Sequence, residues 1–202
     1  MFPDVKPRRK TYGSRAFKGC GSTVKRIRQI NIQGEKNMNE RWFLDMDGTL
    51  AEWKVGCEAE LLSEGYFRNL KPTEFVNPFR EYAKEHPENV YILSHCLVEG
   101  YAYGDKQAWL DQYLPEIPKE HRLLLPCGVC KADYVIDVFH LEKLPETWIL
   151  FDDYSKNLHA WKAAGGMGLK CYNGINGTHG TWKHGGIMWS GELAVMLTQR
   201  DA

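Results

Sequence analysis

The 202-residue sequence lacks the features that mark membrane-spanning and secreted proteins. No apolar run approaches the roughly 20 residues that a helix needs to cross a bilayer. The N-terminal residues also lack the apolar segment of a secretory signal, and we find no internal repeat or low-complexity tract. We therefore expect a globular protein of the cytoplasm with one well-buried core and no membrane partner.

The cysteine patterns of disulfide frameworks and zinc ribbons are also missing. Six cysteines are scattered along a sizeable chain, which favours reduced thiols over a disulfide framework. Cys127 and Cys130 form a single CxxC motif, whereas a zinc ribbon would need a second pair that this sequence does not contain. A redox pair at Cys127 and Cys130 stays open as an alternative.

The net charge is zero, but it is unevenly distributed. Residues 1–37 carry ten Lys and Arg against two acidic residues, and residues 38–202 carry sixteen basic against twenty-four acidic residues. A basic arm can bind nucleic acid by neutralising phosphates. The same stretch is Gly- and Lys-rich and poor in aromatics, as disordered segments are. We interpret residues 1–37 as a basic, disordered leader that need not belong to the native protein, with Met38 as the native start.

Five short apolar runs alternate with helical patterns along the rest of the chain. They lie at residues 42–44, 90–93, 123–125, 148–151 and 168–172, and the second to fourth are near-continuously apolar, as buried parallel strands are. Residues suited to helix N-caps precede four amphipathic segments: Asn77, Asp105, Ser155 and Ser190. This alternation predicts an α/β domain with a mainly parallel five-stranded sheet flanked by helices.

Reactive side chains follow four of these predicted strands. Ligands of such sheets bind at the carboxyl ends of the strands, so we expect one rim to gather Asp45, Asp47, Ser94, Lys131, Asp152 and Asp153. Phosphoryl transfer needs a nucleophile, an acid/base group and charge neutralisation. Carboxylate oxygens are also ligands that Mg²⁺ prefers. The predicted rim supplies one group for each of these roles.

These residues resemble the motifs of the haloacid dehalogenase superfamily. Asp45-Met46-Asp47-Gly48-Thr49-Leu50 resembles motif I, Leu93-Ser94 motif II, Lys131 motif III and Asp152-Asp153 motif IV. The similarity covers roughly residues 41–172. It implies a haloacid dehalogenase-like Rossmannoid fold in residues 38–202, with a small helical cap at about residues 51–88.

The resemblance also implies a role for each residue. Asp45 is expected to be the nucleophile and Asp47 the acid/base group. The implied Mg²⁺ ligands are Asp45, Asp47 through its backbone carbonyl, and Asp152 with Asp153, the resemblance leaving open which of the pair binds directly. Thr49 is expected to orient the motif and, with Ser94, Lys106 and Lys131, to form the phosphate-binding group.

A stretch within the predicted cap, Gly65 to Pro72, is similar to one in the 5′(3′)-deoxyribonucleotidases, the cytosolic type C 5′-nucleotidases. Cap aromatics stack on the base in that family, which implies that Tyr66 and Phe67 bind substrate. The alternative is that both rings pack the cap against the core. Residues 105–109, which include Lys106, and residues 151–158 resemble further segments of the same family.

Three features depart from that family. His95 follows Ser94 where the family has a small hydroxyl residue, the segment from Lys131 to Asp152 is longer than expected, and residues 173–182 are Gly-rich. That last segment either folds over the site, with Asn173 or Asn176 touching substrate, or is a surface loop.

We therefore expect a phosphoric monoester hydrolase that uses Mg²⁺ and an aspartyl-phosphate intermediate on small-molecule phosphate esters, foremost (deoxy)nucleoside monophosphates. One alternative is a phosphatase for another small phosphate ester. The other is a nucleic-acid 3′-end phosphatase or binding protein that uses the basic arm, although nucleic acid is not the partner we expect.

Overall fold

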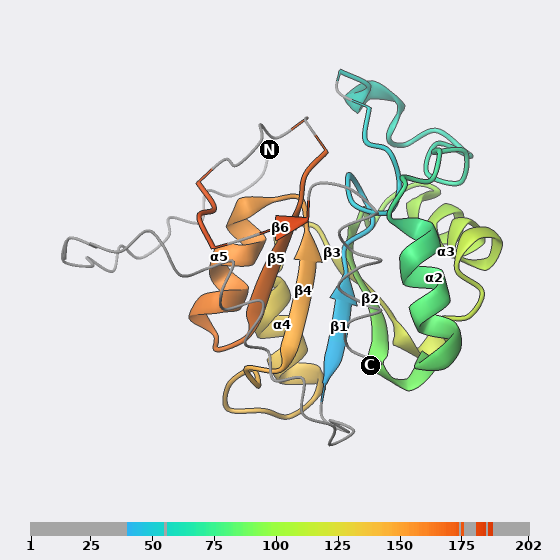
Figure 1. Ribbon diagram of the computed structural model, residues 1–202. Helices are drawn as coiled ribbons and strands as arrows, with labels where there is room; N and C mark the ends of the chain where they lie inside the picture. The colour runs from blue at the N-terminus through green and yellow to red at the C-terminus, as the bar shows by residue number, and fades with distance from the viewer. Residues whose placement is uncertain (1–39, 55, 174, 176–180, 185, 188–202) are drawn as a thin grey trace, which may run out of the picture. The chain divides into compact units, whose positions relative to one another are not determined.

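The computed structural model describes residues 40–54, 56–173, 175, 181–184 and 186–187 (Figure 1). Within this part, six strands form one sheet in the order β3-β2-β1-β4-β5-β6, and every neighbouring pair is parallel. The strands are β1 Arg41–Leu44, β2 Val90–Cys96, β3 Arg122–Pro126, β4 Trp148–Asp152, β5 Met167–Cys171 and β6 Gly186–Ile187. The predicted α/β class and all five predicted strands are confirmed, and the two-residue β6 adds a sixth.

Helices cover both faces of the sheet (Figure 1). They are α2 Val76–Glu85, α3 Ala102–Tyr113, α4 Lys131–Val138 and α5 Ser155–Ala163, with short 3₁₀ helices at Glu58–Glu60, Pro87–Asn89 and Lys119–His121. No helix in the described part of the chain has the length and apolar character that a membrane crossing requires. The predicted leader and the helix expected after Ser190 lie outside the described residues.

The strands feed two hydrophobic cores because successive side chains of a strand point to opposite faces. In β1, Trp42 and Leu44 pack with Phe79 of α2 in one core. Phe43, between them, packs with Trp161 of α5 in the other. Both faces of the central strands are therefore buried, which explains their near-continuously apolar sequences.

The predicted N-cap residues differ from the observed ones by up to four residues. α2 begins at Val76 and α3 at Ala102, before Asn77 and Asp105, and α5 begins at Ser155 itself. None of the residues that precede these helices makes a side-chain capping hydrogen bond. The starts are therefore set by how the helices pack and not by caps, and Asp105 is buried within α3.

The range predicted for the cap divides into two parts in the structure. Residues 52–54 and 56–75 form turns and one 3₁₀ helix, and they (teal in Figure 1) lie beyond the carboxyl ends of the strands. α2 instead packs on the sheet, where Phe79 contacts Trp42 and Phe151. The assignment of a cap stays a prediction, and residues 52–54 and 56–75 are the part of its range that leaves the sheet.

Replacing Phe79 with alanine should destabilise the fold strongly. Its ring is fully buried, with centroids 4.9 Å from Phe151 and 6.2 Å from Trp42. Loss of such a side chain costs about 3–5 kcal/mol of unfolding free energy, measurable by urea denaturation. Tyr103→Ala, at a site on α3 that is 60% exposed, should change it by no more than about 0.5 kcal/mol. Equal effects of the two substitutions would contradict this packing.

Candidate active site

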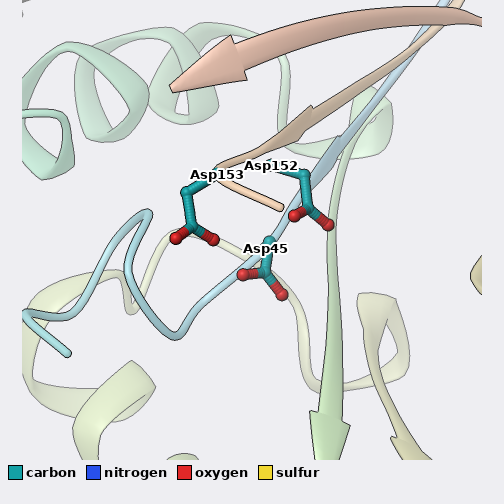
Figure 2. A group of neighbouring side chains, drawn as sticks. All are labelled: Asp45, Asp152 and Asp153. Carbon is teal, nitrogen blue, oxygen red and sulfur yellow. The ribbon is translucent and has the colours of Figure 1, made fainter. Parts of the chain in front are cut away.

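Three carboxylates meet at the ends of two neighbouring strands. Asp45 directly follows β1, Asp152 ends β4 and Asp153 comes next, and the Asp45 N–H donates to the Phe151 carbonyl (2.9 Å) across the strand pair. One oxygen from each carboxylate lies within 4.8 Å of the others, and all three residues are buried. Figure 2 shows the three side chains gathered at the strand tips.

Lys131 neutralises part of this charge. As the first residue of α4, it donates from Nζ to Asp45 Oδ1 (2.5 Å) and Asp152 Oδ2 (2.7 Å). Burial by itself lowers the pKa of Lys131, but the attraction of Asp152 and Asp45 and its hydrogen bonds to them outweigh burial and raise that pKa. The side chain therefore remains an ammonium ion inside the protein.

The carboxylates themselves are under electrostatic strain. Burial raises the pKa of Asp45 well above its usual value, with Asp152, Asp153 and Asp47 adding to the effect and Lys131 opposing it. Burial and then Asp152 raise the pKa of Asp153 to about 6, against the Asn173 hydrogen bond and the charges of Lys131 and Lys170. Converging carboxylates of this kind suit a cation with hard oxygen ligands, so the donor set fits Mg²⁺.

The turn after β1 is fastened to the loop after β4. Gly48 has φ +82°, and a Cβ added there would lie 2.5 Å from Asp153 Oδ2. The Thr49 hydroxyl accepts the Asp153 N–H (3.1 Å), while Asn173 Nδ2 donates to Gly48 O (2.8 Å) and Asp153 Oδ2 (2.7 Å). The position of Asp153 thus depends on residues from two other segments, the turn after β1 and the residues after β5.

A second buried lysine, Lys106, contacts Ser94 of the predicted phosphate-binding group. Lys106 of α3 donates from Nζ to Asp47 Oδ2 (2.5 Å), Ser94 Oγ (3.1 Å) and the His95 carbonyl (2.7 Å). The same Nζ lies 4.9 Å from the centroid of the Phe67 ring. Two lysine-centred groups, one at Asp45 and one at Asp47, therefore flank motif I.

Several of the predicted site residues have side chains that are buried from solvent. Thr49 and Ser94 are fully buried, and Tyr66 and Phe67 are only 8% and 3% exposed, with their rings in edge-to-face contact at 5.0 Å. Asp47 Oδ1 and the Tyr66 hydroxyl are buried without a hydrogen-bond partner among the described residues. The two rings occupy the packing position that the sequence left open as the alternative to base stacking.

Sequence reasoning missed two supporting side chains. Asn157 donates to Asp152 Oδ2 (2.9 Å) from α5. Lys170 is buried in β5, and its Nζ donates to the Asp153 carbonyl (2.6 Å) and Ser155 Oγ (2.9 Å). Burial lowers the pKa of Lys170, against the pull of Asp153 and Asp152. A lysine inside an apolar strand was the available signal, because such a residue needs buried acceptors.

An aromatic pocket borders the carboxylates and was also missed. A cavity of about 400 Å³ is lined by Gly48 and Asn173, which both hydrogen-bond or abut Asp153, and by the rings of Trp53, Phe75 and Tyr172. A larger cavity of about 520 Å³ involves α2 and the end of α3, and none of the predicted site residues lines it. The smaller cavity is the one whose lining includes residues that contact Asp153, namely Gly48 and Asn173.

Gly48→Ala should destabilise the chain more than Gly56→Ala. Both glycines have φ +82°, where an L-residue costs about 1–2 kcal/mol. A Cβ at Gly48 also collides with Asp153, whereas nothing lies within 4 Å of one at Gly56. Urea denaturation without added metal should show an extra loss of about 1–3 kcal/mol for Gly48→Ala. Equal losses would mean that the Gly48–Asp153 approach is not tight.

Comparison with known proteins identifies the family of this chain. The family model of "5′ nucleotidase, deoxy (Pyrimidine), cytosolic type C protein" matches residues 58–169, more than half of the chain. No curated protein sequence matches. Among solved structures, the chain is similar to the HAD domain of effector protein Lem4 from Legionella pneumophila. The structure of the inactive mutant is 19% identical in sequence, with 80% of this chain and 94% of that chain covered and a TM-score of 0.45. The other structure of that domain is 20% identical, with 80% of this chain and 95% of that chain covered and a TM-score of 0.44.

The family match confirms the expected resemblance to the cytosolic type C 5′-nucleotidases. The matched residues include Ser94, Lys106, Lys131 and the Asp152–Asp153 pair, and they begin after motif I. The chain belongs to the cytosolic type C 5′-nucleotidase family.

Proposed function

We propose that this protein is a Mg²⁺-dependent phosphomonoesterase that acts on (deoxy)nucleoside monophosphates through an aspartyl-phosphate on Asp45. The observation that carries the proposal is the position of Asp45. Its carboxylate belongs to the buried acidic group with Asp152 and Asp153 and is bound by Lys131. A cytoplasmic location remains a prediction.

The metal would be held by Asp45, the Asp47 carbonyl and the Asp152–Asp153 pair. When bound, Mg²⁺ would neutralise charge on the phosphoryl oxygens. Both Asp152 oxygens already accept protein hydrogen bonds, from the Tyr154 N–H (2.7 Å) and from Lys131 and Asn157. These bonds would hold the Asp152 carboxylate in one orientation.

The residues then divide the reaction between them. An Asp45 oxygen attacks phosphorus, the bond from phosphorus to the ester oxygen breaks, and Asp47 donates a proton to that leaving oxygen. Asp47 next takes a proton from water, which attacks the aspartyl-phosphate and releases phosphate. Lys131, Lys106 and Ser94 bind the phosphoryl oxygens. Lys106 breaks one of its three hydrogen bonds within the protein and donates to a phosphoryl oxygen in its place.

The aromatic pocket supports a nucleotide as the substrate. Trp53 and Tyr172 are half-buried, and both line the pocket that Gly48 also lines. Stacking a base on one aromatic ring contributes about 1–3 kcal/mol. Because Tyr66 and Phe67 are almost fully buried, we assign base contact to Trp53 and Tyr172 in their place.

Asp45→Asn should abolish turnover. The amide cannot form the acyl phosphate, so kcat should fall by at least about a thousandfold. The assay is Mg²⁺-dependent phosphate release from nucleoside monophosphates, sugar phosphates and oligonucleotide 3′-phosphates, with circular dichroism to verify folding. Asp137→Asn, at an exposed carboxylate of α4, is the matched control and should match the unmodified chain. Retained turnover in Asp45→Asn would exclude the covalent mechanism. A preference for another ester would contradict the assignment of nucleoside monophosphates as the substrate.

Trp53→Ala should raise KM for nucleoside monophosphates with little change in kcat. Loss of stacking worth about 1–3 kcal/mol corresponds to roughly a 5- to 150-fold change in KM. KM for a sugar phosphate, which has no base, should stay within about twofold. Tyr101→Ala, at an exposed ring away from the pocket lining, serves as control. Equal changes for both substrate classes would show that Trp53 does not contact the base.

A further inference from the structure

The CxxC motif lies in the connection that delivers Lys131 to the site. Cys127 follows Pro126, the last residue of β3, and Cys130 precedes Lys131, the first residue of α4. Both are free thiols in the structure, Cys127 exposed and Cys130 half-buried. A small thiol reagent can therefore reach Cys127 without unfolding of the domain.

The connection has room to change shape. It turns between Pro126 and Val129, where the Val129 N–H donates to the Pro126 carbonyl (3.3 Å). Gly128 in this turn has φ +89°, and no atom lies within 4 Å of the position of an added Cβ. The space beside Gly128 is therefore open.

The same turn contacts the residue that follows Ser94. The His95 ring donates from Nε2 to the Val129 carbonyl (2.9 Å), and β2 pairs with β3 up to Cys96 and Pro126. Lys131, at the other end of the turn, binds Asp45 and Asp152. The CxxC turn therefore lies between two groups of the phosphate-binding set.

The thiols do not form a metal site in this structure. Among the described residues, the group of His, Cys, Asp or Glu side chains close enough to hold an ion is Asp45, Asp152 and Asp153. Two free thiols separated by two residues of the chain, one of them exposed, are suited to thiol–disulfide exchange.

We propose that Cys127 and Cys130 form a reversible dithiol–disulfide pair that is oxidised by a low-molecular-weight disulfide such as glutathione disulfide. The Cys127 thiolate attacks one sulfur of the reagent, whose S–S bond breaks and releases one glutathione thiolate. The Cys130 thiolate then attacks Cys127 Sγ and releases the second. Two protein thiols are oxidised, one disulfide is reduced to two thiols, and the two protein protons pass to solvent and the released thiolates.

Closing this bridge should displace Lys131. A disulfide requires its Cβ atoms to be about 3.5–4.5 Å apart and fixes the dihedral angle about the S–S bond. Cys130 is the residue that precedes α4, so its movement is passed directly to Lys131. A shift of about 1 Å in a positioning group can lower a rate by about a hundredfold. This consequence rests on the proposed function, whereas the disulfide itself does not.

The thiol chemistry is tested on the full chain in glutathione redox buffers. Free thiols are trapped by alkylation, followed by intact mass and peptide mapping. We expect loss of two hydrogen atoms and a Cys127–Cys130 bridge. Cys127→Ser and Cys130→Ser should form no bridge, and Cys57→Ser, at a half-buried cysteine of another segment, should behave like the unmodified chain. Absence of the bridge in oxidising buffer, or pairing of Cys127 with the buried Cys96, would overturn the proposal.

Phosphate release tests the coupling to Lys131. The oxidised chain should lose at least tenfold in kcat/KM and recover with dithiothreitol, whereas Cys127→Ser should be insensitive to oxidation. A bridge that forms without loss of activity would overturn the coupling to Lys131. If the reduced chain releases no phosphate from any ester, the proposed function fails, and the mass measurement still decides the disulfide.

Discussion

The site depends on one buried ammonium group held between two carboxylates. Moving an isolated charge into a protein costs several kcal/mol, even after the structure relaxes. Asp45, Asp152 and Asp153 are all buried, and burial raises the pKa of both Asp45 and Asp153. Lys131 binds two of the three carboxylates directly and opposes this rise in the pKa of Asp45. α4 must therefore begin where its first residue, Lys131, can bind both Asp45 and Asp152.

The parallel sheet supplies the second constraint. β1 lies between β2 and β4 in the sheet. The turn after β1 therefore has neighbouring segments on both sides. On one side Lys106 binds Asp47, and on the other Asp153 abuts Gly48. Motif I thus has the buried Lys106 on one side and the aromatic pocket on the other. This arrangement agrees with the proposed substrate, which joins a phosphate to a flat ring.

Sequence patterns predicted what depends on local periodicity and on strand ends. The five apolar runs became strands, and Asp45, Asp152 and Asp153 meet because parallel strands end at one edge. Helix starts were missed because packing, and not a capping side chain, fixes them. α4 was missed because its eight residues give little more than two helical turns.

The remaining misses are contacts between distant segments. Trp53 and Tyr172 line one pocket although over one hundred residues separate them, and no local pattern pairs them. Tyr66 and Phe67 kept two interpretations, base contact or packing against the core, because an aromatic pair in a sequence carries no information about its burial. The structure places them against each other and beside Lys106.

The charges around the acidic group favour a divalent cation over a monovalent one. Asp45, Asp152 and Asp153 carry three negative charges when ionised, and Lys131 contributes one fully buried positive charge. Lys170 donates to the Asp153 carbonyl rather than to a carboxylate. The Asp47–Lys106 pair balances itself. The three carboxylates and Lys131 together leave two negative charges, which a hard divalent cation compensates and a monovalent cation does not.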